Sequence, residues 1–401
     1  MQYDFSTVLD RSGYRFIAVD VNPFPDVAIE EGFSKIPMWV ADMSFPTAPP
    51  VLDAIRNRLD MPNFGYFELP DLYYDSILSW HNSRKPVEGL AAEHILYENS
   101  VLGGVSSTVC ALTEPGDPVL LHNPLYVGFS EVMEQTGRRP VCSSLVPDRD
   151  GIWRMDYEDM DRKIKENGIR LAVFCSPHNP CGRVWEREEI LQAMEVFRTN
   201  GCTVISDEIW SDILMPGHTH IPTASVSADA KSRTVSFYAP SKTFSLAGLI
   251  GSYGIVFDPE LREQLKAYGS KTFLNNPNVL SMSALIGAYS AEGEEWVRQM
   301  NLAVEKNLRT AHSFITSRFP GVRSMLPEGT YMLFLDCSEY CEKYGVPIQE
   351  LQRRAVRKGV IWQDGTAFLW PDSIRMNLAL PFSLLEKALD ILEKYVFTEV
   401  R

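Results

Sequence analysis

The stretch that decides the fold is TVSFYAPSKTFSLAGLIGSYGIVF, residues 234–257. Two short apolar runs, TVSFYAP (234–240) and SYGIVF (252–257), enclose a small, glycine-containing turn that carries Lys242. Short runs rich in β-branched and aromatic residues, bounded by turn residues, are typical of buried strands. The stretch therefore predicts two strands of one sheet, with a lysine at the end of the first.

The same pattern extends outward along the chain. Further short apolar runs are PVLLH (118–122), LAVFC (171–175) and CTVISDE (202–208), and amphipathic stretches such as EREEILQAMEVFRTNG (186–201) lie between them. Strands that alternate with helices form a mainly parallel sheet with helices on both faces. The sequence therefore predicts an α/β fold.

The two ends of the chain differ from this middle part. An irregular, proline-rich N-terminal stretch leads to a predicted helix that begins near Pro49. Beyond about Ser283 the pattern becomes long helices (294–319), short strands near GTYMLFLD (329–336) and a closing helix (383–396). We expect an N-terminal arm with part of a small domain (1–48), a large domain (49–283) and a smaller α+β domain (284–401).

Composition excludes several classes of function. With 401 residues and 45% hydrophobic content, the chain can bury a large core. Its formal net charge of -14 argues against a nucleic-acid partner, because no basic excess exists to neutralise phosphates. No apolar run reaches the roughly 18 to 20 residues of a membrane helix, and the N-terminus lacks a signal pattern. We expect a cytoplasmic protein that does not bind membranes.

Cysteines and histidines give no sign of a metal site. The chain has seven cysteines, an odd number without CxxC spacing, so we expect reduced thiols. The spacing that most resembles a pair of metal ligands is His218 and His220, but no cysteine or carboxylate cluster accompanies it. We therefore predict no metal centre.

Candidate chemical groups follow the predicted strands. Ligands of open α/β sheets bind outside the carboxyl ends of the strands. Lys242 lies just after the predicted strand TVSFYA (234–239). A lysine in a desolvated pocket has a lowered pKa and forms imines. The alternative, a solvated surface lysine, is the commoner case. Asp207 follows the predicted strand CTVIS (202–206) directly. A buried carboxylate at this place keeps a pyridine nitrogen protonated. Alternatively, Asp207 caps a helix or forms a surface pair with Glu208.

Two further residues follow strands in the same way. Asn179 lies in SPHNPCGR (176–183), where its amide can donate to a phenolate-type oxygen or act only as a turn residue. Tyr126 follows PVLLHNPL (118–125), where its ring can stack on a planar cofactor or pack in the core.

Two segments can bind anionic groups. In NSVLGGVSS (99–107), Ser100 is a helix N-cap candidate and two glycines allow close backbone approach, a combination suited to phosphate. Arg375 lies in the apolar run SIRMNLALP (373–381). A charge there needs a partner, either the α-carboxylate of an amino acid or a structural carboxylate.

Together and in this order, these segments resemble fold type I pyridoxal 5'-phosphate (PLP) enzymes, the aspartate aminotransferase superfamily, over nearly the whole chain. MWVADM (38–43), SPHNP (176–180), SDEI (206–209) and APSKTF (239–244) look most like the MalY/PatB group of cystathionine β-lyase-like C–S lyases. The resemblance implies a PLP-dependent transferase-like fold, with a mainly parallel seven-stranded sheet in the large domain and a smaller α+β C-terminal domain.

The resemblance also implies a set of site residues. Lys242 would form the imine with PLP and later move the proton, Asp207 would bind the pyridine nitrogen and Asn179 the ring hydroxyl. The remaining residues implied are Tyr126 stacked on the ring, Leu102, Gly103 and Ser241 at the phosphate, Arg375 and Ala41 at the substrate, and Tyr66 reaching the phosphate of a partner subunit. A homodimer with shared active sites follows from the last role.

Three positions depart from the pattern of the superfamily. Ala239 and Ile250 stand where many aminotransferases have a phosphate-binding serine or glycine and an arginine. Trp210 stands where aminotransferases have a tyrosine that touches the ring oxygen, and where the MalY-like group commonly has a histidine. We therefore expect backbone amides, Ser241 and the neighbouring subunit to hold the phosphate, and Asn179 alone to bind the ring oxygen.

The resemblance implies β-elimination, which converts a cysteine S-conjugate into a thiol, pyruvate and ammonia. Transamination by a class I/II aminotransferase is the alternative, and both routes use every residue named above. A regulatory PLP-binding protein is a third hypothesis, although no basic helix-turn-helix segment accompanies the enzyme fold.

Overall fold

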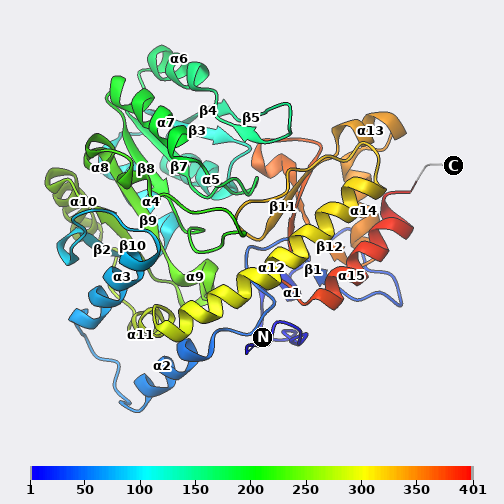
Figure 1. The fold of residues 1–401 in the computed structure, drawn as a ribbon, viewed down its shortest axis with the longest axis horizontal. Coiled ribbons are helices and arrows are strands. Elements are labelled where there is room, and N and C mark those ends of the chain that lie inside the picture. Colours follow the sequence, from blue (N-terminus) through cyan, green and yellow to red (C-terminus); the bar gives the residue numbers. More distant parts are fainter. Residues whose placement is uncertain (1, 399–401) are drawn as a thin grey trace.

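A seven-stranded sheet forms the centre of the computed structural model, which describes residues 2–398 (Figure 1). The strand order is β2-β10-β9-β8-β7-β3-β4, and β10 runs antiparallel to both of its neighbours while the other pairs are parallel. The strands are β2 (Ile95–Glu98), β3 (Pro118–Asn123), β4 (Arg139–Ser144), β7 (Leu171–Cys175), β8 (Thr203–Asp207), β9 (Thr234–Tyr238) and β10 (Ser252–Val256). The mainly parallel sheet predicted from the sequence is confirmed.

Helices cover both faces of this sheet because alternate side chains of each strand point to opposite faces. Leu120 and Ala172 face one set of helices, whereas Val119 and Val173 face the other. The first set is α6 (Tyr157–Asn167), α7 (Arg187–Thr199) and α8 (Ala228–Arg233), and the second is α4 (Val101–Leu112), α5 (Val127–Thr136) and α10 (Pro259–Thr272).

The ends of the chain build the other part of the molecule, which carries α13, α14 and α15 in Figure 1. A three-stranded antiparallel sheet has the order β11-β14-β13, and β1 pairs in parallel with β12, so the N-terminal arm joins the C-terminal segment. These strands are β1 (Ile36–Pro37), β11 (Met332–Asp336), β12 (Val360–Ile361), β13 (Gln363–Asp364) and β14 (Ser373–Asn377), and a separate hairpin consists of β5 (Val146–Pro147) and β6 (Trp153–Arg154). The domain boundaries at residues 48 and 283 stay predictions.

The remaining helices connect these parts. The 28-residue helix α12 spans the long predicted helical stretch, and α2 begins at Pro49, where the sequence predicts a helix start. These helices are α1 (Ile17–Asp20), α2 (Pro49–Leu59), α3 (Asp71–Arg84), α9 (Pro240–Thr243), α11 (Val279–Ala288), α12 (Ala291–Arg318), α13 (Ser338–Tyr344), α14 (Ile348–Arg357) and α15 (Phe382–Ile391).

A glycine brings the first residues of α4 to the edge of the sheet where the candidate groups lie. A Cβ atom at Gly104 would lie 2.4 Å from the ring of Phe237 in β9, so a glycine is required for α4 to pack this closely. The helix starts at this point because the Ser100 side chain accepts a hydrogen bond from the Gly103 amide as an N-cap.

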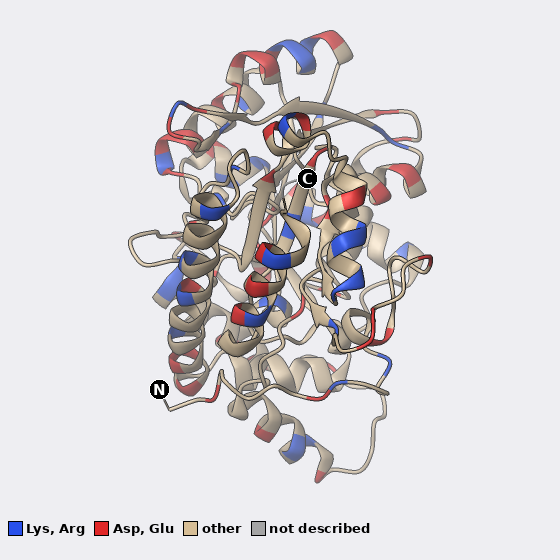
Figure 2. Cartoon of the chain, turned by 90° about the vertical axis from the view of Figure 1, so that its right-hand side faces the viewer, with Lys and Arg blue, Asp and Glu red and all other residues tan. Residues whose placement is uncertain are grey.

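In the cartoon of Figure 2, acidic and basic residues alternate along the outer helices and also occur in loops. Within residues 2–398, no helix is long and apolar enough to cross a membrane. The same residues contain no group of three or more histidine, cysteine, aspartate or glutamate side chains suited to a metal ion.

Candidate active site

A cavity of about 180 Å³ lies at the carboxyl ends of β7, β8 and β9. It brings together seven residues that the sequence predicts for one site, namely Ala41, Leu102, Tyr126, Asn179, Asp207, Ser241 and Lys242. Other lining residues include Val101, Cys175, Ile209, Trp210, Ala239 and Ile250. The carboxyl edge of the sheet is where open α/β folds bind ligands, as expected from the strand pattern.

Lys242 lies in the short helix α9, and its amine is buried in this cavity. The Nζ atom donates a hydrogen bond of 2.9 Å to the carbonyl oxygen of Ala41. Burial and the nearby Arg375 guanidinium lower the pKa of Lys242 to about 8, because both disfavour the ammonium form. The uncharged amine, which a nucleophile or base requires, is therefore far more populated near neutral pH than in an ordinary lysine, although the ammonium form still predominates at pH 7.

Asp207 and Glu208 are adjacent in the chain, but their surroundings differ. The Asp207 carboxylate accepts a hydrogen bond from the Ile209 amide at 3.1 Å, and burial raises its pKa to about 7. The Glu208 carboxylate accepts from His220 Nε2 at 2.7 Å and from the Tyr238 hydroxyl at 2.6 Å. Asp207 thus lies in the cavity with no basic side chain from residues 2–398 in contact, whereas Glu208 belongs to a buried structural network.

The electrostatics of Glu208 follow from that network. Burial acts to raise the pKa of this carboxyl, but the His220 ring and the donated hydrogen bonds outweigh it and the pKa is lowered. His220, one of the two histidines with spacing similar to metal ligands, therefore pairs with the Glu208 carboxylate.

Arg375 of β14 does not line the cavity but is buried beside it, in contact with Asn179, which does. Its guanidinium donates to Asn179 Oδ1 at 3.1 Å, to Gln363 Oε1 at 2.6 Å and to the Trp39 carbonyl oxygen at 2.8 Å. The Nε atom is buried and has no hydrogen-bond partner among the described residues, and burial lowers the pKa of the group to about 10. No carboxylate pairs with Arg375 within residues 2–398, so the structural salt bridge that the sequence left open is not found there.

The phosphate candidates meet at the first turn of α4 and at α9. Leu102 and Ser241 line the cavity, whereas the Gly103 amide already donates to Ser100 Oγ at 2.9 Å. Ile250 is half exposed and has φ +59°, a region that β-branched residues rarely adopt. The Ile250 side chain, which stands where many aminotransferases have an arginine, therefore gives the phosphate end of the cavity an apolar surface.

Tyr66 lies outside the cavity. Its side chain is fully exposed in the loop between α2 and α3 and lines a separate groove with residues 276–280. Within a single chain, Tyr66 therefore does not meet the other predicted phosphate ligands.

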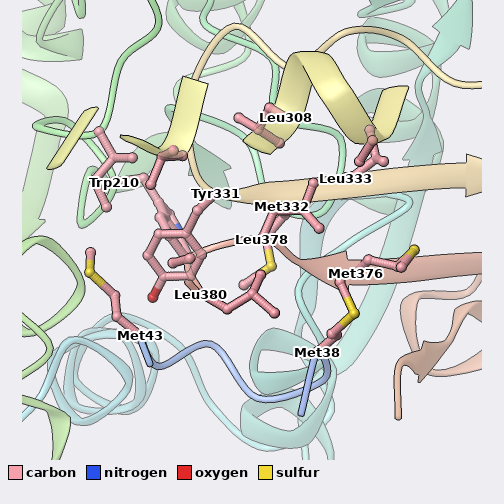
Figure 3. Packing of buried hydrophobic residues seen from close by; sticks show 14 of the residues in the cluster. Met38, Met43, Trp210, Leu308, Tyr331, Met332, Leu333, Met376, Leu378 and Leu380 are labelled. Carbon is pink, nitrogen blue, oxygen red and sulfur yellow. The ribbon is translucent and has the colours of Figure 1, made fainter. Parts of the chain in front are cut away.

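The sequence did not single out Tyr331, which packs beside the site. Its hydroxyl donates to the Ala41 carbonyl oxygen at 3.0 Å, the same atom that accepts from Lys242. Its ring meets Trp210 edge to face with centroids 4.7 Å apart (Figure 3). The residue lies in the apolar run near GTYMLFLD, so its sequence context indicated only a core position.

Three comparisons connect this arrangement to known proteins. Cystathionine beta-lyase PatB from Bacillus subtilis is 36% identical over 334 residues, which cover 83% of this chain and 84% of that protein. The PLP-bound C–S lyase from Staphylococcus hominis has a TM-score of 0.88 at 29% identity, covering 98% of each chain. Cystalysin from Treponema denticola, whose crystal structure contains a pyridoxal 5'-phosphate cofactor, has a TM-score of 0.89 at 27% identity, also covering 98% of each chain.

These similarities confirm the fold type I architecture and the MalY/PatB-like resemblance that the motifs predicted. The family model for aminotransferase class I and II matches residues 40–392, which include every predicted site residue. The chain belongs to the aminotransferase class I and II family.

Proposed function

We propose that the protein is a PLP-dependent carbon–sulfur β-lyase that cleaves cysteine S-conjugates to a thiol, pyruvate and ammonia. The observation that carries this proposal is the buried Lys242 amine, with its lowered pKa, in one cavity with Asp207. Relatives with this fold include a cystathionine beta-lyase and a C–S lyase, which supports elimination as the reaction.

The residues of the cavity fit PLP. Asp207 is a buried carboxylate with a single hydrogen bond among the described residues, and a protonated ring nitrogen is the partner that would stabilise its charged form. Asn179 Oδ1 is engaged by Arg375, so its Nδ2 is the donor that remains for the ring oxygen. Tyr126 offers an aromatic face, and Leu102 and Ser241 lie at the phosphate end near the start of α4.

When bound, PLP supplies a positively charged ring that accepts the electron pair released at the α-carbon of the substrate. Arg375 binds the α-carboxylate through charge-assisted hydrogen bonds, which orients the Cα–H bond toward Lys242. Lys242 Nζ removes the α-proton, and its pKa of about 8 suits a base that works near neutral pH. The carbon–sulfur bond then breaks, and the overall reaction consumes one water and yields one thiol, one pyruvate and one ammonia.

We further infer a homodimer located in the cytoplasm. The fully exposed Tyr66 can contribute to a phosphate site only in another subunit, because it lies outside the cavity of its own chain. All seven cysteines are unpaired, which suits a reducing compartment.

Transamination is the second candidate, because the family model describes aminotransferases and the same residues serve both reactions. The deciding experiment incubates the PLP-loaded protein with L-cystathionine and no keto acid. A lyase gives many turnovers of pyruvate per subunit. A single turnover that resumes only after a keto acid is added would establish the aminotransferase instead.

A further inference from the structure

The Lys242 amine and the Tyr331 hydroxyl donate hydrogen bonds to the same acceptor, the carbonyl oxygen of Ala41. Their distances to this oxygen are 2.9 Å and 3.0 Å. Tyr331 is fully buried and does not line the cavity, and the mechanism proposed above gives its hydroxyl no task. A buried hydroxyl that shares the acceptor of the reacting amine can influence that amine without touching a substrate.

The backbone on both sides of Ala41 is held by a single side chain, that of Asn377. Its Nδ2 atom donates to the carbonyl oxygens of Val40 at 2.7 Å and of Asp42 at 2.6 Å. The position of the Ala41 carbonyl between them is therefore fixed without the Tyr331 hydroxyl. Holding this segment in place does not explain why the hydroxyl is there.

The ring of Tyr331 is placed by contacts that do not involve its hydroxyl. It meets the Trp210 indole edge to face, with centroids 4.7 Å apart and an interplanar angle of 75° (Figure 3). Its backbone carbonyl oxygen accepts from the Leu378 amide at 2.9 Å. Lys242 Nζ lies 5.8 Å from the centroid of the same indole. Tyr331→Phe retains these contacts and removes only the hydroxyl, so the effect of the hydroxyl on Lys242 is separable from packing.

Sharing one acceptor has two physical consequences for Lys242. A carbonyl oxygen has two lone pairs and accepts from both donors, but the Tyr331 O–H directs its positive end at the oxygen that attracts the Lys242 ammonium. The carbonyl therefore stabilises the ammonium less, which favours the uncharged amine. When the amine leaves Ala41, the Tyr331 hydroxyl remains as a partner, so no acceptor is left unpaired at a cost in free energy.

We propose that Tyr331 is a positioning residue that acts on Lys242 through the Ala41 carbonyl oxygen, and that by sharing this acceptor it frees the amine to bond to the cofactor and to move the α-proton. The second of these tasks rests on the proposed lyase function. The first concerns the amine itself and holds for any reaction at this site.

Charged groups on three other elements also act on the Lys242 amine. Burial and the Arg375 guanidinium of β14 lower its pKa, whereas Asp42 and Asp207, the last residue of β8, act to raise it. Among the described residues, the Tyr331 hydroxyl has no hydrogen bond to any of these groups. Tyr331→Phe therefore changes the strength of the Ala41 carbonyl as an acceptor and leaves the surrounding charges in place.

Competitive labelling with acetic anhydride measures the pKa of Lys242 in the full chain without a cofactor. Mass spectrometry quantifies the label in the Lys242 peptide as a function of pH, with a free amino acid as the internal standard. We expect Tyr331→Phe to raise the pKa of Lys242 by roughly 0.5 to 1, because the ammonium regains an undivided acceptor. Labelling at pH 7 should then slow by about threefold to tenfold.

Tyr340→Phe is the matched control for this measurement. It removes the hydroxyl of another buried tyrosine, which donates to the Thr398 carbonyl oxygen at 3.3 Å, and should leave the labelling of Lys242 unchanged. A labelling profile of Lys242 in Tyr331→Phe that matches the wild type overturns the proposal.

The PLP-loaded protein tests the same effect during turnover of L-cystathionine. In Tyr331→Phe, kcat near neutral pH should fall by about threefold to tenfold and the acid limb of its pH profile should move to higher pH, while KM stays within about twofold. A pH profile that keeps its position refutes the role in proton transfer, whether or not kcat falls. If no substrate yields pyruvate with the wild type, the lyase proposal fails, and the labelling result alone decides the role of Tyr331.

Discussion

Arg375 Nη1 donates to Asn179 Oδ1 at 3.1 Å, although the two residues are 196 positions apart in the chain. Asn179 follows a strand of the large sheet and Arg375 lies in β14 of the C-terminal part. The contact fixes which atom of the Asn179 amide points away from Arg375. Arg375, the candidate for binding the substrate carboxylate, and Asn179, the candidate for binding the ring oxygen, are thus held together by a direct hydrogen bond.

Arg375→Lys should raise KM for amino-acid substrates by about tenfold or more, because a lysine cannot form the paired hydrogen bonds of a guanidinium. The variant should change kcat less than KM, since Lys242 and Asp207 stay in place. Steady-state kinetics measure both parameters, and Arg318→Lys, an exposed pair with Glu393, is the control. A KM within twofold of wild type would show that Arg375 does not bind the carboxylate.

Lys242→Ala should abolish both the visible absorption band of the PLP-loaded protein and multiple turnover, because no other amine is buried in the cavity within the described residues. Absorbance spectra and pyruvate release measure the two effects. Lys394→Ala removes an exposed lysine of the C-terminal helical segment and should retain both properties. A band that persists in Lys242→Ala would assign the covalent link to another residue.

Asp207 should make the cofactor-free protein less stable as the pH rises. Its pKa is about 7 in the folded state, above the ordinary value of 3.8, because burial disfavours the carboxylate. Between these values the folded protein holds a proton that the unfolded chain has released, so stability falls from about pH 4 to about pH 7. The difference between the two pKa values corresponds to a loss of at most about 4 kcal/mol of unfolding free energy.

Asp207→Asn should remove this dependence, and the cofactor-free variant should therefore exceed the wild type in stability at pH 8 but not at pH 4. Urea unfolding at the two pH values measures the difference between the proteins, which cancels the titration of groups that both share. Equal differences at pH 4 and pH 8 would contradict a raised pKa at Asp207.

A buried ion pair supports the turn that follows β8. Asp212 accepts hydrogen bonds from Lys85 Nζ, Trp80 Nε1 and Arg84 Nε, each at 3.1 Å, and the Asp212 and Lys85 side chains are almost fully buried. Asp212→Asn should cost about 3 to 5 kcal/mol of unfolding free energy, because the Lys85 charge stays buried without its partner.

Lys85→Met in the Asp212→Asn background should restore part of this loss, since it removes the unpaired charge and retains the volume of the side chain. Chemical denaturation of the single and double variants measures the recovery. A double variant that is as unstable as Asp212→Asn would show that the ion pair is not the cause.

The local sequence was sufficient for five of the seven strands of the sheet and for residues that follow them at its carboxyl edge, but β2 and β4 were not predicted. Five apolar runs correspond to strands of the seven-stranded sheet, and the predicted helix start at Pro49 is where α2 begins. Lys242, Asp207 and Asn179 meet in one cavity because parallel strands deliver their carboxyl ends to the same edge.

The sequence by itself determined this strand and helix pattern, because periodicity and turn residues act over a few positions. Only the tertiary structure decided that Glu208 binds His220, that Tyr331 shares the Ala41 carbonyl with Lys242, and that Arg375 lacks a carboxylate partner in the described chain. These contacts join residues between 12 and 290 positions apart, so they depend on how the chain packs in three dimensions. The environment of Lys242, which sets the pKa of its amine, belongs to this second group.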